Sequence, residues 1–206
     1  MTANRKRLTL STMRLAAVFC LLASVALPPL CRAEAPVFVI TPENSTIKFS
    51  VKASVAIDGT FDKWNATLKF TSPDVSTGVL DIEIQAASVN TGSGMKDGKL
   101  KGKDFFDSEN DPLISFKSTG IKQTGPDTFD VPGTFTIRGV SKPETLSLTV
   151  SGRGTGSGAV KGTMAFDRKL YGMNSGIPFI KIADRVEVTV DIHAKRTSGP
   201  PVEFKQ

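Results

Sequence analysis

The chain has 206 residues and a formal net charge of +6, with 39% hydrophobic and 22% charged residues. This length and composition are typical of a globular protein with one domain. Because the chain has one histidine and two cysteines, a metal site would need several carboxylates, which argues against the common zinc sites.

The first 33 residues have the layout of a secretory signal peptide. Basic residues at 5–7 and at Arg14 precede the apolar segment 16–27, and the small residues of CRAEA follow it. This apolar segment is too short for a transmembrane helix, which needs about 20 apolar residues. We therefore expect cleavage after Ala33 and export of residues 34–206 as a secreted domain.

Removal of this leader changes the charge and the chemistry of the chain. The leader carries five of the 26 basic residues and no acidic residue, which leaves 21 basic residues against 20 acidic ones. A nucleic-acid-binding surface would need a retained basic surplus, so this class of protein is not expected. Cys20 and Cys31 also leave with the leader, so the mature chain has no disulfide, thiol nucleophile or cysteine-based metal site.

Short segments of alternating apolar and polar residues run through the mature chain, separated by clusters of Gly, Pro, Asn, Asp and Ser. A period of two predicts antiparallel strands rather than helices. These segments predict about eight strands. In chain order their apolar positions are Ile47, Phe49 and Val51; Leu68 and Phe70; Leu80, Ile82 and Ile84; Ile114 and Phe116; Phe129, Val131, Phe135 and Ile137; Leu146, Leu148 and Val150; Val160, Met164 and Phe166; and Val186, Val188, Val190 and Ile192.

Only residues 86–106 and 169–183 are long enough to carry helical turns, and neither segment shows a period of 3.6 residues. With so few helices, a sheet with one apolar face must close on itself or pack on a second sheet. A sandwich remains compatible with this pattern. The Phe-, Ile-, Leu- and Met-rich apolar face favours a barrel, which at eight strands holds packed side chains or one small ligand.

Three segments resemble the YceI-like family. Residues 100–119, LKGKDFFDSENDPLISFKST, are similar to that family's "DFFD…P.I.F.S" pattern, residues 133–148 to its "G.lTi.GvtkPv.l" hairpin, and residues 166–176 to its "R.dfGm" segment. The resemblance covers residues 38–194. It implies an all-β, extended lipocalin-like barrel of eight antiparallel strands with one or two short helical segments. It also implies export to the periplasm and a hydrophobic tunnel that binds a polyisoprenoid.

The sequence departs from that family's pattern at two places. Residues 99–101 read Lys-Leu-Lys where many relatives have His-Leu-Arg, and residues 169–171 read Lys-Leu-Tyr where an acidic residue and Phe are usual. If Lys99, Lys101 and Tyr171 touch a ligand head group, its identity differs here. The lysines between 96 and 103 form either a solvated basic loop or a partner for a phosphate or anionic lipid head group.

The adjacent Phe105 and Phe106 raise the question of whether this segment is a site. Neighbouring residues of a strand point to opposite faces, so both rings could not enter one pocket from a strand. On a helical turn they could plug a barrel mouth together, before the turn residues 107–111 and Pro112 lead into the next strand. We predict a structural lid at the tunnel mouth, and direct ligand contact remains an alternative.

No catalytic, cofactor or metal site is expected. Parity places His193 on the polar face of the last strand beside Asp191, where a Ser-His-Asp triad is not expected. The acids between 104 and 111 lack the spacing and the glycine of a calcium-binding EF-hand loop. Residues 154–159, GTGSGA, match a dinucleotide fingerprint formally, but they join two strands and predict a hairpin tip.

We interpret the chain as a non-enzymatic periplasmic protein that carries or buffers an isoprenoid quinone or a polyprenyl chain. Two alternatives remain: a structural or partner-binding barrel with a filled core, and an enzyme that acts on a lipid. Transient contact with a membrane or a membrane redox protein, and a homodimer, are left open. The predicted ligand-lining residues are Phe49, Phe70, Ile82, Phe105, Phe106, Phe116, Phe135, Ile137, Met164, Phe166 and Phe179, with Trp64 and Ile180 as further candidates.

Overall fold

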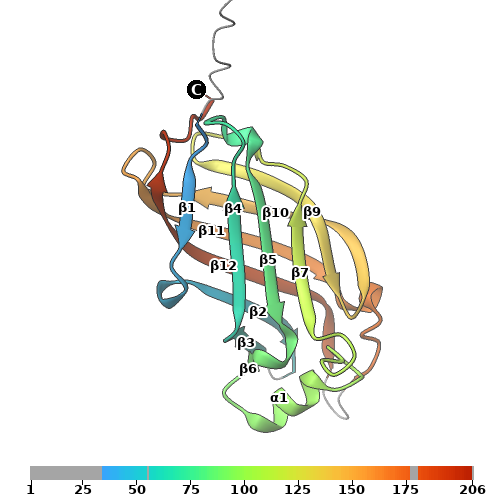
Figure 1. Cartoon of the computed structure of the whole chain (residues 1–206). Coiled ribbons are helices and arrows are strands. Elements are labelled where there is room, and N and C mark those ends of the chain that lie inside the picture. The colour runs from blue at the N-terminus through green and yellow to red at the C-terminus, as the bar shows by residue number, and fades with distance from the viewer. Residues whose placement is uncertain (1–33, 55, 177–180, 206) are drawn as a thin grey trace, which may run out of the picture. The chain divides into compact units, whose positions relative to one another are not determined.

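A closed antiparallel sheet forms the body of the protein (Figure 1). The computed structural model describes residues 34–54, 56–176 and 181–205. Pairing of the first strand with the last closes a ring of eight strands, which confirms the predicted barrel. In ring order the strands are β1 (Val37–Ile40), β4 (Trp64–Lys69), β5 (Val79–Gln85), β7 (Leu113–Ser118), β9 (Thr128–Ile137), β10 (Val140–Val150), β11 (Ser157–Asp167) and β12 (Ile182–Ser198).

The long strand β12 has two partners along one edge. Its C-terminal half pairs with β1, and its N-terminal half pairs with β2 (Thr46–Ala53). The sheet continues from β2 through β3 (Ile57–Phe61) to β6 (Val89–Asn90), and the short β8 (Lys122–Gln123) pairs with β9. Within the described ranges no ladder joins β3 to β4. The strands β2, β3 and β6 therefore extend the sheet at one end of the barrel without closing a second ring.

Alternation along the strands places the predicted apolar residues inside the barrel, since successive side chains of a strand point to opposite faces. Ile82, Phe116 and Phe135 lie opposite one another on three neighbouring strands and are at most 5% exposed. Val131 and Leu146 are fully buried beside them. These side chains fill the middle of the barrel.

Short helical segments confirm the expected helical turns. The helix α1 (Gly94–Lys101) and the turn after it cover the end of the barrel near β3 and β6 (Figure 1). The 3₁₀ segments are η1 (Pro42–Asn44), η2 (Val75–Thr77), η3 (Ala86–Ser88) and η4 (Arg168–Tyr171). No helix among the described residues is both long and apolar enough to cross a membrane.

One glycine in the wall lets a ring of the core approach the backbone. A Cβ atom on Gly133 would lie 2.6 Å from the carbonyl oxygen of Lys117 and 2.7 Å from the ring of Phe116. We expect Gly133→Ala to lower the free energy of unfolding by roughly 1–3 kcal/mol, the usual cost of overpacking. Urea unfolding measures this change.

The control is Gly120→Ala, because a Cβ atom there meets no other atom within 4 Å. We expect this variant to stay within about 0.5 kcal/mol of the parent protein. Equal stability of the Gly120 and Gly133 variants would show that the close approach of Phe116 does not constrain the wall.

Candidate functional site

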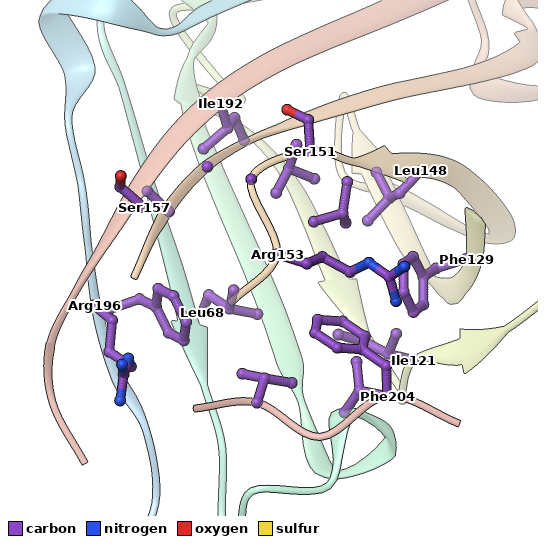
Figure 2. A pocket seen from close by; sticks show the side chains of 18 of the residues that line it. Leu68, Ile121, Phe129, Leu148, Ser151, Arg153, Ser157, Ile192, Arg196 and Phe204 are labelled. Atoms are coloured by element: carbon purple, nitrogen blue, oxygen red, sulfur yellow. The ribbon is translucent and has the colours of Figure 1, made fainter. Parts of the chain in front are cut away.

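Two apolar cavities lie at opposite ends of the barrel interior. The larger, here called the C-terminal cavity, has a volume of about 130 Å³ (Figure 2). The smaller, here called the double-Phe cavity, has a volume of about 60 Å³. Strand β12 contributes Val190 and Ile192 to the first, and Val186 and Val188 to the second. The filled middle of the barrel separates the two cavities.

The C-terminal cavity has apolar walls. They come from both sides of the barrel, and include Phe38, Leu68, Ile121, Phe129, Leu148 and Ile192 (Figure 2). Alternation had already placed Leu68, Phe129, Leu148 and Ile192 on the inner face. Such a surface is suited to a hydrocarbon chain, whose transfer from water is favourable in proportion to the apolar area removed.

The chain beyond β12, residues 199–205, folds across the end of this cavity; we call it the strap. Gln123 receives a hydrogen bond from the backbone N of Lys205 at 2.7 Å and donates one to its carbonyl oxygen at 2.9 Å. The backbone of Glu203 bonds to Pro73 at 2.8 Å and to Val75 at 3.1 Å. The side-chain amide of Gln123 and backbone hydrogen bonds to Pro73 and Val75 therefore hold the strap to the neighbouring segments.

Side chains of the strap contribute to the cavity itself. Val202 and Phe204 are half-buried and line it, and the ring of Phe204 lies 5.8 Å from that of Phe129, measured between centroids. The packing of Val202 and Phe204 narrows the open end of the C-terminal cavity. Displacement of the strap would therefore enlarge the cavity without any change to the barrel strands.

Both charged side chains among the cavity's lining residues are arginines. Arg153 lies in the hairpin loop between β10 and β11, and Arg196 lies on β12. Gly152, Gly154 and Gly156 of this loop have φ angles between 74° and 80°, a left-handed conformation that glycine adopts easily. The glycines therefore form the predicted hairpin tip between β10 and β11.

The double-Phe cavity lies beneath the turn that follows α1. Phe105 and Phe106 are 4% and 8% exposed, and both line it. The ring centroid of Phe106 lies 5.8 Å from that of Phe61 and 6.2 Å from that of Phe49, in the tilted and edge-to-face arrangements that aromatic pairs favour. The two rings therefore cap the core at this end, as expected of a lid.

The predicted ligand-lining residues divide among three places. Phe70 lines the C-terminal cavity, while Ile82, Phe116 and Met164 are buried in the barrel without lining either cavity. Phe179 and Ile180 lie outside the described residues, and Trp64 is half-buried beside the gap between β3 and β4. Direct ligand contact by this set stays a prediction. The members that line the double-Phe cavity are Phe49, Phe105, Phe106, Phe135, Ile137 and Phe166.

Tyr171 does not face open space. It is fully buried, and its hydroxyl donates a hydrogen bond of 3.0 Å to Oε1 of Glu144. Its ring packs edge-on against Phe135 and Phe166, with centroid distances of 5.5 and 5.2 Å. Burial, together with the hydrogen bond to Glu144, raises the pKa of Tyr171 above its ordinary value. A neutral, hydrogen-bonded phenol here stabilises the core.

One lysine near α1, Lys99, has a protein partner as well. Lys99 forms an ion pair with Asp104, and the hydrogen bond from Lys99 is the main reason why the pKa of Asp104 lies below its usual range. Asp104 also accepts a hydrogen bond of 3.0 Å from Ser175. An anionic head group at this end would have to compete with Asp104 for Lys99.

Arg168 occupies a buried position in the segment that resembles the family pattern. Its guanidinium donates hydrogen bonds to the carbonyl oxygens of Ala183, Met173 and Ser175. It also lies 3.3 Å from Oδ1 of Asp184. These bonds tie η4 and the segment after it to the start of β12, so the role of Arg168 is structural.

His193 lies on the exposed face of β12, as alternation predicts. Its Nε2 atom lies 3.6 Å from Oδ1 of Asp191, and its side chain is 46% exposed. Within residues 34–54, 56–176 and 181–205, no group of three or more His, Cys, Asp or Glu side chains could hold a metal ion.

Sequence reasoning placed many of the apolar walls of the C-terminal cavity on the inner face, but it missed Arg153, Arg196 and the strap. Arg196 follows Ile192 and Ala194 at spacings of two, so alternation along β12 could have placed it on the inner face. Glu144 could have been placed inside in the same way, from Leu146 and Leu148. No periodic signal marks the strap or Arg153, which lie in irregular segments.

Comparison with known proteins gives a family and a fold. A family model described as the YceI-like domain matches residues 38–194. A UPF0312 protein of Pseudomonas syringae pv. tomato is 36% identical over 98 residues, 48% of this chain and 51% of that protein. Protein YceI of Escherichia coli O157:H7 is 32% identical over 96 residues, 47% of this chain and 50% of that protein. The chain thus spans about half the length of the curated relatives it matches.

Solved structures with the same fold include BcnA of Burkholderia cenocepacia, with 25% identity and a TM-score of 0.68 over 75% of this chain and 99% of that one. A polyisoprenoid binding domain from Saccharophagus degradans, implicated in plant cell wall breakdown, has a TM-score of 0.61 over 78% of this chain and 99% of that domain. Its identity is 17%, so this likeness concerns the fold alone.

Proposed function

Because the chain belongs to the YceI-like family, we propose that it binds a lipid with an isoprenoid chain in its barrel and acts as a carrier or buffer rather than an enzyme. The observation that carries this proposal is the C-terminal cavity, an apolar space at an end of a closed barrel. The polyisoprenoid binding domain of the same fold supports the ligand class. The leader-like residues 1–33 support a location in the periplasm.

The size of the cavities determines how a chain would enter. Ligand pockets commonly measure about 300–1,000 Å³, whereas the C-terminal cavity measures about 130 Å³. A short chain segment fits once the strap side chains Val202 and Phe204 move outward. A longer chain would also need Ile82, Phe116 and Met164 to change rotamers, so that the two cavities join.

Burial of hydrocarbon alone supplies useful affinity. At about −0.3 kcal/mol per heavy atom, a chain of about 20 carbons gains about −6 kcal/mol, and one of about 40 carbons gains about −12 kcal/mol. These free energies correspond to dissociation constants of tens of micromolar and of nanomolar order. No catalytic group is needed for this function.

A second candidate is a structural or partner-binding barrel whose core is permanently filled. The packed belt of Ile82, Phe116, Phe135, Val131 and Leu146 favours it, because tight packing resists the insertion of a chain. This candidate predicts that no lipid is taken up.

Uptake from vesicles distinguishes the two candidates. The protein is incubated with phosphatidylcholine vesicles that contain a polyprenol, the vesicles are removed by flotation, and the polyprenol left with the protein is quantified. We expect close to one polyprenol per chain. An amount of polyprenol no greater than that left after flotation of vesicles without the protein would contradict the lipid-binding function, and a modified polyprenol would indicate an enzyme.

A further inference from the structure

The charge at the rim of the C-terminal cavity indicates a head group. Among the described residues, Arg153 and Arg196 are the two charged ones in its lining, and they come from different elements, the β10–β11 loop and β12. In Figure 2, Arg153 extends toward the rings of Phe129 and Phe204, and Arg196 lies on the opposite side of the view. An apolar interior with a cationic rim is complementary to an amphipathic anion.

Arg153 is held in place but retains hydrogen-bonding capacity. Its Nε atom lies 2.6 Å from Oδ1 of Asp127, and its guanidinium carbon lies 4.9 Å from the ring centroid of Phe204. An arginine has five N–H donors in a planar fork, which suits bidentate recognition of phosphate. The ion pair uses the Nε edge, so the terminal N–H groups remain for a ligand. The carboxylate of Asp127 orients the guanidinium and would lie beside the bound anion.

Arg196 stands at the point where the strap begins. It donates a hydrogen bond to the carbonyl oxygen of Gly199, and its backbone N–H bonds to the carbonyl oxygen of Gly156 at 2.7 Å. The described residues place no carboxylate within 4 Å of its guanidinium. A Cβ atom on the neighbouring Gly154 would meet nothing within 4 Å, so the loop leaves room for a head group.

The opposite end of the barrel offers a poorer anion site. Among the described residues, Arg168 is the charged side chain that lines the double-Phe cavity, and no lysine lines it. The guanidinium of Arg168 is already bonded to the carbonyl oxygens of Ala183, Met173 and Ser175 and lies against Asp184. The cavity there is also smaller, at about 60 Å³. A neutral head group such as a quinone presents only carbonyl acceptors and needs no second cation. The positive charge of two arginines beside one apolar cavity is instead complementary to a negatively charged phosphate.

We infer that the lipid of the C-terminal cavity is a polyprenyl phosphate, whose phosphate Arg153 and Arg196 bind at the rim while the first isoprene units enter the barrel. This inference rests on the proposed lipid-binding function and names its ligand class. The strap, which begins next to Arg196, lies over the entrance. When the strap moves away, the bound phosphate would replace the contact that Arg153 loses with Phe204.

The test compares two lipids with the same hydrocarbon chain, geranylgeranyl phosphate and geranylgeraniol, by titration of residues 34–206 and native mass spectrometry. We expect the phosphate to bind at least about tenfold more tightly than the alcohol, the effect of one charge-assisted hydrogen bond. Arg153→Gln and Arg196→Gln should each weaken binding of the phosphate by about tenfold more than they weaken binding of the alcohol. Inorganic phosphate alone should bind far more weakly than the lipid phosphate.

The control is Arg185→Gln, an exposed arginine at the other end of β12 that pairs with Glu187, and it should change neither affinity. Equal binding of alcohol and phosphate, with no effect of Arg153→Gln or Arg196→Gln, would overturn the head-group inference but leave the lipid-binding function intact. Inorganic phosphate that binds as tightly as the lipid phosphate would show an anion site unconnected to lipid. Absence of binding by both lipids would contradict the proposed function itself.

Discussion

Arg168→Met is expected to lower the free energy of unfolding by roughly 3 kcal/mol, the largest stability effect that we predict. The side chain of Arg168 is 7% exposed, and its removal leaves the carbonyl oxygens of Ala183 and Ser175 without their donor. Methionine fills similar space but donates no hydrogen bond. Asp184 keeps a second partner, Lys169 at 2.9 Å. The loss of stability therefore comes mainly from the carbonyl groups that no longer receive a hydrogen bond. Urea unfolding measures it.

A matched control lies nearby on β12. Arg185 is 70% exposed and lies 3.3 Å from Glu187, so Arg185→Met removes a surface ion pair worth about 0–1 kcal/mol. Arg168→Lys keeps the charge but lacks the planar fork, and its stability should fall between those of the parent and Arg168→Met. If Arg168→Met proved as stable as Arg185→Met, the account of Arg168 as the anchor of η4 would be wrong.

Ala194→Phe is expected to weaken lipid binding by about tenfold or more while the barrel stays folded. Ala194 is 8% exposed, lines the C-terminal cavity and lies opposite Gly158 on β11. A phenyl ring at this position would occupy part of the C-terminal cavity, where we propose that the lipid chain binds. Displacing about five chain carbons, at about 0.3 kcal/mol each, corresponds to about a tenfold loss of affinity. Titration with geranylgeraniol measures the effect without any contribution from a charged head group.

The control for this substitution is Ala165→Phe. Ala165 lies between the buried Met164 and Phe166 on β11, so its side chain points away from the interior. The added ring is the same, but it lies on the outer face and should leave affinity unchanged. Equal affinity of Ala194→Phe and the parent protein would place the ligand elsewhere, with the double-Phe cavity as the next candidate.

The fold could be predicted from local patterns wherever a strand has one buried face. Alternation along residues 186–192 and 80–84 is regular, and the structure has β12 and β5 there. Four strands escaped prediction. In β3, Asp58 and Gly59 interrupt the apolar residues. The strands β1, β6 and β8 have only four, two and two residues, too few to show an alternating pattern, although β1 closes the barrel. The division of one edge of β12 between β1 and β2 is a matter of long-range pairing, which no local pattern records.

The candidate site could be predicted only in part. The double Phe of residues 105–106 was correctly expected to cap one end, because two adjacent rings and a following turn are visible in the sequence. The larger cavity lies at the other end, and its entrance depends on the return of the strap to Gln123 and Pro73. That return is made by the side-chain amide of Gln123 and by backbone hydrogen bonds between residues far apart in the sequence. Such contacts carry no periodicity, so Phe204 and Arg153 could not be assigned to a site from sequence.

Native mass spectrometry of the protein purified without detergent, followed by solvent extraction of anything released, tests the central claim most directly. The account predicts one isoprenoid lipid per chain, and the head-group inference predicts that this lipid carries a phosphate. A mass that corresponds to the bare chain, and that stays unchanged after incubation with geranylgeranyl phosphate and with an isoprenoid quinone, would contradict the lipid-binding function and favour a barrel with a permanently filled core.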